Sequence, residues 1–195
     1  MFVLLLISVI AIGIIIEKYL QLKRVRKANA ALRDSLGQQQ TLEGIRSALA
    51  SSGSASPLGI MLDKLFNSST TKLELLSQSM ESSANLQLHE LEKGLGWLST
   101  FAAIAPLIGF LGTVIGMVRV FMKIQLSSQT TVDISMLSGG IWEALLTTIG
   151  GLVVGIPMII FYNDLVQKLE NIVKDMQDSA VEYTIKFQEL NPGGQ

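Results

Sequence analysis

The chain of 195 residues contains no cysteine and one histidine, and only 16% of its residues are charged. The absence of cysteine excludes disulfides, thiolate metal sites and a cysteine nucleophile, and it leaves the redox compartment undecided. His89 lies in a polar segment, and one imidazole without a thiol argues against a zinc site. The net charge of −1 gives no overall basic field, and no basic cluster is interleaved with aromatics, so we expect no nucleic-acid partner.

The sequence also lacks the patterns of an enzyme. It shows no nucleophile beside a base, no paired carboxylates and no phosphate-binding loop. Its glycine-rich stretches lie inside apolar segments rather than between a strand and a helix. We therefore expect neither enzymatic activity nor a cofactor.

Long uncharged runs are what the sequence has in abundance. Hydrophobic residues make up 49% of the chain, and the mean hydropathy is +0.45, which is high for a soluble domain. Three segments are long enough to cross a hydrocarbon core of about 30 Å as helices, namely residues 1–22, 94–118 and 134–163. No basic residue precedes the first run and no small-residue cleavage site follows it, so we interpret it as a membrane helix rather than a signal peptide. The predicted fold is an all-α integral membrane protein with three transmembrane helices.

The basic residues indicate an orientation. Ten of the 15 Lys and Arg lie between Ile16, where the first uncharged run ends, and the start of the second run, three follow the third run, and two lie between the second and third. Cytoplasmic segments carry the excess of Lys and Arg, so the N-terminus is predicted outside and the C-terminus inside. Residues 23–93 then form a cytoplasmic helical region, and residues 119–133 form a short periplasmic loop.

Two of the helices are predicted to extend beyond the membrane into a cytoplasmic helical bundle. Apolar residues at steps of three and four run from Leu73 to Leu98 without a proline, which predicts one helix from about Thr71 to Val118. The same spacing from Leu165 to Phe187 predicts that the third span continues through residues 164–190. We expect these apolar stripes to pack either against each other or against neighbouring subunits. The spacing shows that a stripe is buried but does not identify the surface that buries it.

The remaining segments are shorter. A helix is predicted over residues 19–36, followed by a turn region over 38–57 that contains the serine-rich run SSGSAS. A proline-initiated helix is predicted over residues 57–66. The terminal NPGGQ of residues 191–195 should end the last helix and form a disordered tail.

Small residues recur at helical spacing within the second and third spans. They favour close helix packing, and they are Ala105, Gly109, Gly112, Gly116, Gly151 and Gly155. Thr113 and Thr148 lie beside these small faces. Their hydroxyls either bond to carbonyls one turn earlier in the same helix or line a polar path.

Glu143 lies inside a 30-residue stretch, 134–163, that is otherwise uncharged. An ionisable group at membrane depth is a functional candidate, here at the mouth of a polar cavity. The alternative is a headgroup-level anchor beside the aromatic Trp142. No Asp, Glu, Lys, Arg or His lies between Lys93 and Arg119 or between Glu143 and Asp164. A proton path through the membrane centre would therefore need a carboxylate from a partner.

Two motifs resemble the ExbB/TolQ branch of the MotA/TolQ/ExbB proton-channel family. LEKGLGWLSTFAAIAPLIGFLGTVIGMV, residues 91–118, is similar to the second span of that family, with its A-P-x-x-G-x-x-G-T-V core. LSGGIWEALLTTIGGLVVGIPMIIFYN, residues 137–163, is similar to the third span. Relatives usually have a segment before the first span, so either Met1 is not the native start or that segment is dispensable.

The resemblance implies a proton-channel subunit in the bacterial inner membrane that forms a homopentamer around a central pore. A single-span partner of the ExbD/TolR type would supply the membrane aspartate, and the proton motive force would drive a TonB- or TolA-type energiser. Thr113, Thr148 and Glu143 match the pore-facing polar positions of the family. A non-conducting membrane scaffold is the alternative. A small carrier is the weakest hypothesis, because three spans offer no inverted repeat.

Overall fold

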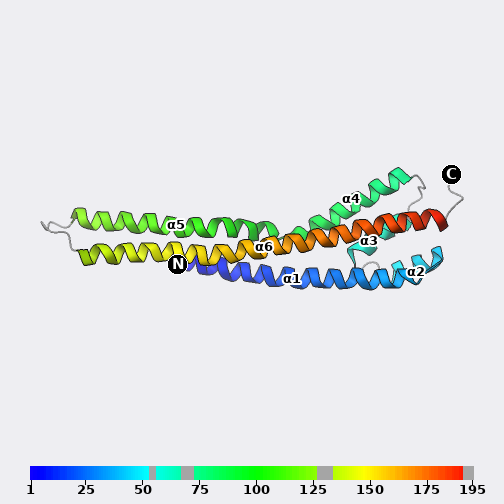
Figure 1. Ribbon diagram of the computed structural model, residues 1–195, viewed down its shortest axis with the longest axis horizontal. Helices are drawn as coiled ribbons and strands as arrows, with labels where there is room; N and C mark the ends of the chain where they lie inside the picture. The colour runs from blue at the N-terminus through cyan, green and yellow to red at the C-terminus, as the bar shows by residue number, and fades with distance from the viewer. Residues whose placement is uncertain (53–55, 67–72, 127–133, 191–195) are drawn as a thin grey trace. The chain divides into compact units, whose positions relative to one another are not determined.

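The structure, a computed structural model, describes residues 1–52, 56–66, 73–126 and 134–190. Within these ranges every regular element is an α-helix (Figure 1): α1 (Phe2–Gly37), α2 (Leu42–Ser52), α3 (Pro57–Phe66), α4 (Leu73–Glu92), α5 (Leu95–Leu126) and α6 (Ile134–Leu190). Three of them, α1, α5 and α6, are long and apolar enough to cross a membrane. The prediction of an all-α membrane protein is confirmed.

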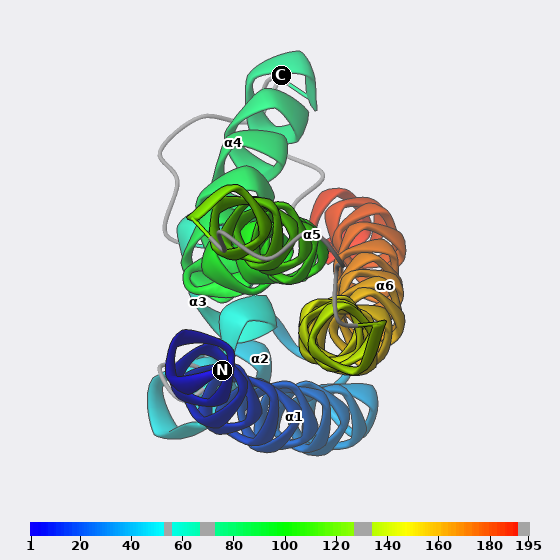
Figure 2. The same cartoon turned by 90° about the vertical axis from the view of Figure 1, so that its left-hand side faces the viewer.

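The chain divides into two compact units. The membrane unit comprises Met1–Glu17 and Gly94–Asp164, and the bundle unit comprises Lys18–Lys93 and Leu165–Gln195. In the membrane unit, the start of α1, all of α5 and the first part of α6 appear as separate rods when viewed end-on (Figure 2). Large apolar side chains on α5 and α6 point outward, including Leu107, Phe110 and Val153. Such an exposed apolar surface suits a lipid environment.

The bundle unit buries the apolar stripe predicted on the second half of α6. All its members are buried: Leu165, Leu169, Ile172, Met176, Ala180, Tyr183 and Phe187. Phe187 packs edge-on against Phe66 of α3, with ring centroids 5.3 Å apart. Arg33 of α1 donates to the carbonyl oxygen of Asp175 at 2.9 Å and to the hydroxyl of Ser179. Of the two arrangements left open by the spacing, this chain packs the stripe against its own helices.

The prediction of one helix from about Thr71 to Val118 is wrong, because the chain turns between α4 and α5. Gly94 has a φ of 90°, a conformation that glycine adopts at helix C-termini and that side chains with a Cβ disfavour. The Nζ of buried Lys18 donates to the carbonyl oxygen of Leu91 at 3.2 Å and so satisfies a group that the end of α4 leaves open. The apolar stripe runs across this break, which is why spacing alone did not reveal it.

The predicted turn region over residues 38–57 is also wrong in part, since α2 occupies Leu42–Ser52. The hydroxyl of Thr41 accepts from the backbone N–H of Gly44 at 3.2 Å, as a helix N-cap does. Ile45 and Leu49 then form the buried face of α2. The next helix starts as predicted: Ser56 caps α3 through the N–H of Gly59 at 2.9 Å, and Pro57 is its first residue.

The segment predicted as a loop over residues 119–133 begins as helix, because α5 continues to Leu126. Residues 119–126 are therefore helical, while the rest of that loop, 127–133, lies outside the described residues. The proposed helix start at residues 71–72 and the predicted disordered tail, 191–195, lie outside them as well. The predicted continuation of the third span to residue 190 is present as the single helix α6.

Candidate functional site

The small residues of α5 and α6 face each other within one chain. A Cβ atom placed on Gly109 would lie 2.9 Å from the Cα of Gly151 and 2.8 Å from the carbonyl oxygen of Thr147. A Cβ on Gly151 would lie 2.7 Å from the carbonyl oxygen of Ala105. The two backbones thus approach too closely for any larger residue, which is how small faces let helices pack in lipid.

The same contact extends along both helices. A Cβ on Gly116 would lie 2.7 Å from the Cβ of Ala144, and one on Gly155 would lie 2.7 Å from the ring of Pro106. Gly112 faces the side chain of Thr147, whose Cβ would lie 2.8 Å from an added Cβ. The small-residue face is therefore used between two helices of the same subunit, so an interface between subunits would need other faces.

Three threonine hydroxyls gather in the middle of this contact. The hydroxyls of Thr113 and Thr148 are hydrogen-bonded to each other across the two helices. Thr113 Oγ1 also lies 3.1 Å from the carbonyl oxygen of Ala144, and Thr148 Oγ1 lies 3.2 Å from that of Gly109. Both side chains are half-buried. The structure thus brings together two of the predicted polar residues, through bonds between helices rather than within one.

Each hydroxyl has a single proton to donate, and this limits the pattern of hydrogen bonds. When Thr113 donates to Thr148, Thr148 can donate to the carbonyl of Gly109. When Thr148 donates to Thr113, Thr113 can donate to the carbonyl of Ala144. The pair therefore has two alternative arrangements that run in opposite directions. The cluster can switch the direction of its hydrogen bonds, but it contains no titratable group that could hold a proton.

Thr147 is a member of this cluster that the sequence reasoning did not select. Its hydroxyl donates to the carbonyl oxygen of Ala144 at 2.7 Å, and it lies 3.1 Å from the carbonyl oxygen of Gly109. The bond to Ala144 is the back-bond within one helix that was considered for the threonines. Thr147 could have been identified from its position opposite Gly112 of α5. That position is known only once the register between α5 and α6 is known.

Glu143 is not brought into the threonine cluster. Its side chain is exposed, as is that of neighbouring Trp142. The cluster faces α5, whereas Glu143 lies about 140° around α6 from Thr148, five residues away at 100° per residue. Any joint role of the three predicted polar residues therefore requires a neighbouring molecule at the exposed face.

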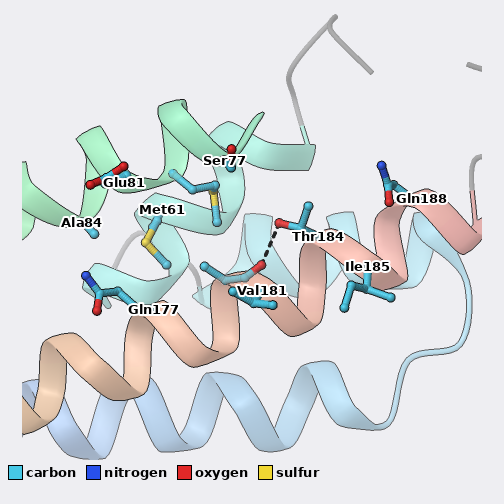
Figure 3. Close-up of a pocket in the computed structure, with 11 residues that line it drawn as sticks. Met61, Ser77, Glu81, Ala84, Gln177, Val181, Thr184, Ile185 and Gln188 are labelled. Carbon is cyan, nitrogen blue, oxygen red and sulfur yellow. Dashed lines mark hydrogen bonds between the residues drawn. The ribbon is translucent and has the colours of Figure 1, made fainter. Parts of the chain in front are cut away.

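The bundle unit contains a separate apolar groove of about 450 Å³. Met61 of α3 points toward the groove from one side, and Val181 and Ile185 of α6 border it from the other (Figure 3). Thr184 uses its hydroxyl to bond the carbonyl oxygen of Ala180 at 2.7 Å within the same helix. Among the described residues, no three His, Cys, Asp or Glu side chains are placed to hold a metal ion.

Comparison with known proteins adds a family match. The model of the MotA/TolQ/ExbB proton channel family matches residues 54–178, which include α5, the threonine cluster and most of α6. The matched segment thus carries the site described above.

Individual relatives agree with that match. The chain is 31% identical over 161 residues to a putative biopolymer transport protein ExbB-like 3 of Synechocystis, covering 80% of this chain and 75% of that protein. It is 34% identical over 107 residues to the Tol-Pal system protein TolQ of Haemophilus influenzae, covering 55% of this chain and 46% of TolQ. It is 29% identical over 181 residues to the biopolymer transport protein ExbB of Salmonella typhimurium, covering 86% and 70%.

Proposed function

The chain belongs to the MotA/TolQ/ExbB proton channel family, in its ExbB/TolQ branch, and on that premise we propose that it uses the proton motive force to drive a TonB- or TolA-type partner from the bacterial inner membrane. Membership makes it a multi-pass membrane protein and a subunit of an energy-transducing proton-channel complex. The observation that carries the proposal is the family match over the two helices that hold the threonine cluster.

The distribution of charge supports a partner that supplies the proton-carrying group. α5 has no Asp, Glu, Lys, Arg or His before Arg119, and α6 has none between Glu143 and Asp164. The Thr113 and Thr148 hydroxyls offer hydrogen bonds there but cannot hold a charge. We propose a single-span ExbD/TolR-type partner that brings an aspartate into a pore lined by Thr113 and Thr148, with Glu143 toward its outer mouth.

The proposed assembly is a homopentamer with periplasmic N-termini and cytoplasmic C-termini. The small-residue face is occupied by the α5–α6 contact. The exposed apolar side chains of α5 and α6 are the surfaces left for lipid, for neighbouring subunits and for the partner helices.

Proton flux in liposomes tests the proposal. The chain alone should give no flux above that of empty liposomes, and flux should appear when the single-span partner is reconstituted with it. Strong flux from the chain alone would show that it contains its own proton-carrying group and would contradict the partner role. A complex that forms but never conducts would favour the alternative, a non-conducting oligomeric scaffold.

Two isosteric variants make the test specific to the hydroxyl pair. Thr148→Val removes the bond to Thr113, whereas Thr147→Val removes only hydroxyl-to-carbonyl bonds. We expect Thr148→Val to reduce flux through the complex about tenfold, less than the roughly hundredfold minimum of a group that itself exchanges the proton, because the hydroxyl only offers hydrogen bonds. Thr147→Val is the matched control and should stay close to wild type. Equal flux in both variants would assign the hydroxyls to helix packing.

A further inference from the structure

A second pocket of about 780 Å³ lies in the bundle unit between α1 and the second half of α6. Its lining combines four basic side chains with two acidic ones: Lys23, Arg26, Lys168, Lys174, Asp175 and Asp178. The lining therefore carries a net positive charge. Its volume falls within the range of pockets that hold small molecules. None of these residues belongs to the threonine cluster.

Apolar side chains form the rest of the wall. Leu20 is exposed, whereas Leu22 and Ile172 are buried behind the basic groups. Tyr19 is half-buried, and the Nζ of Lys168 lies 4.5 Å from the centre of its ring. A pocket for a free inorganic anion has no need of an apolar wall, whereas a ligand with both a charged and an apolar end would use both parts.

The end of the pocket that carries Tyr19 and Lys168 lies at headgroup depth along the two helices. The first uncharged run ends at Ile16 and the last at Asn163. Tyr19 and Lys168 come three and five residues later, which is about 5–8 Å along a helix. That distance equals the thickness of one headgroup layer, since a bilayer measures about 40–45 Å in total around a core of about 30 Å.

The charges are ordered along this direction. Lys23 and Lys168 lie nearer to the uncharged runs, and Asp175 and Asp178 lie farther along α6. Lys23 and Arg26 come seven and ten residues after Ile16, about 10–15 Å along the helix. Because helix side chains tilt toward the N-terminus of their helix, here toward the uncharged run, their aliphatic stems can cover apolar surface while their charged ends reach a phosphate. Both side chains are exposed.

From this combination we propose that the pocket binds the headgroup of an anionic phospholipid, with Lys23, Arg26 and Lys168 on the phosphate and Leu20 against the start of an acyl chain. Basic pockets beside membrane helices are suited to such headgroups. The arrangement is independent of proton conduction, so it would stand if the proposed function failed.

Two double variants of α1 separate a built pocket from general attraction to a charged surface. Lys23→Gln/Arg26→Gln changes two residues that line the pocket, and Arg24→Gln/Lys27→Gln changes one Lys and one Arg in the same turns that do not. Both double variants lose the same charge from exposed positions. Lys168→Gln is a third variant that tests the α6 side of the same pocket.

The measurement is native mass spectrometry of the purified full chain titrated with phosphatidylglycerol, with phosphatidylcholine or with inorganic phosphate. We expect phosphatidylglycerol to bind tighter than phosphatidylcholine, and we expect Lys23→Gln/Arg26→Gln to weaken it about tenfold while Arg24→Gln/Lys27→Gln changes it less than about twofold. Lys168→Gln should weaken it too. Circular dichroism should show unchanged helix content in all three variants.

Three results would overturn the proposal. Equal losses in the two double variants would assign the preference to diffuse charge. Equal affinity of the wild type for both lipids would remove the headgroup preference. Displacement of phosphatidylglycerol by an equal concentration of inorganic phosphate would identify a site for a free anion rather than a lipid.

Discussion

The two units of this chain hold their helices together by different means. In the membrane unit, α5 and α6 meet through glycines and hydroxyls, and the large apolar side chains of both helices point outward. In the bundle unit, leucine, methionine and aromatic side chains are buried, and Arg33 and Lys18 reach backbone carbonyls. Lipid gives no hydrophobic driving force between helices, so close backbone packing and hydrogen bonds must act there. In water, the hydrophobic effect favours the burial of large apolar side chains.

The largest expected difference between the units comes from the same substitution made in each. Leu62 of α3 is fully buried, whereas Leu107 of α5 is 64% exposed. Leu62→Ala should destabilise the protein by about 2–5 kcal/mol, because it leaves a cavity. Leu107→Ala should change stability by less than about 0.5 kcal/mol. Thermal unfolding in mild detergent, followed by circular dichroism, measures both. Similar losses would mean that the membrane unit also depends on large apolar side chains.

A smaller effect is expected from adding one methyl group to the membrane unit. Gly109→Ala places a Cβ within 3 Å of the backbone of α6, which cannot move aside as a side chain can. We expect a loss of about 1–3 kcal/mol from overpacking. Gly13→Ala in α1 is the matched control, since nothing lies within 4 Å of its added Cβ. It should be neutral or slightly stabilising, because alanine favours helix more than glycine does.

The same contact can be checked directly by crosslinking. The chain has no cysteine, so a Gly116→Cys/Ala144→Cys variant can form only the designed disulfide within the chain. Rapid oxidation to an internal disulfide, with the band still at the monomer position on a non-reducing gel, would agree with the α5–α6 register. A dimer on that gel would place these residues between subunits.

The hydroxyl pair should contribute less to stability than the glycine contact. A double-mutant cycle of Thr113→Val and Thr148→Val isolates the bond between the two hydroxyls. We expect a coupling energy of about 0.6 kcal/mol, the average for such bonds between membrane helices. Chemical unfolding in detergent provides the four stabilities. A coupling energy of zero would mean that any effect of these threonines on proton flux does not arise from the hydrogen bond between them.

The smallest effect is expected for an exposed ion pair of the bundle unit. Lys93 donates to Glu90 at 2.6 Å, and this hydrogen bond, followed by the charge of Lys93, holds the pKa of Glu90 below its ordinary value of 4.5. A lowered folded-state pKa stabilises the fold above about pH 4.5, and this stabilisation is lost as the pH falls through the folded-state value.

Glu90→Gln should therefore lower stability slightly at neutral pH, and this difference from the wild type should disappear as the pH falls below about 4.5. Glu92→Gln removes the same charge two residues away and is the control. Melting curves from pH 3 to 7 measure both. A large loss of stability at pH 7, or a loss that persists at pH 3, in Glu90→Gln alone would contradict the assignment of a weak, exposed ion pair.

The sequence predicted the long, regular helices better than it predicted the helix breaks and the short helix between them. The unbroken spacing from Leu165 to Phe187 correctly indicated one long α6, and Pro57 correctly marked the start of α3. The break before α5 was missed because a glycine in the left-handed region leaves the apolar spacing unchanged. The helix α2 was missed because its serines resembled a loop, although Thr41 offered an N-cap.

The threonine site could be predicted only in part for a related reason. Small and hydroxyl residues at Gly112, Thr113 and Thr148 indicated polar, closely packed helices, and these residues do lie at the α5–α6 contact. The register that pairs Gly112 with Thr147, and the exposure of Glu143 away from the cluster, depend on how two helices are rotated against each other. The spacing of residues within one helix does not determine how that helix is rotated against its neighbour.

The bonds of the two units also differ in how much chain separates their partners, and this sets an order of events during synthesis. Thr113 and Thr148 are 35 residues apart, whereas Lys186, which donates to the carbonyl of Gln39, is 147 residues from it. After Thr148 has been added, a ribosome needs about two to eight more seconds to reach Lys186. The contact between α5 and the first part of α6 can therefore form before the second half of α6 is available to the bundle unit. During that interval the apolar faces of α3 and α4 lack the partner that later covers them.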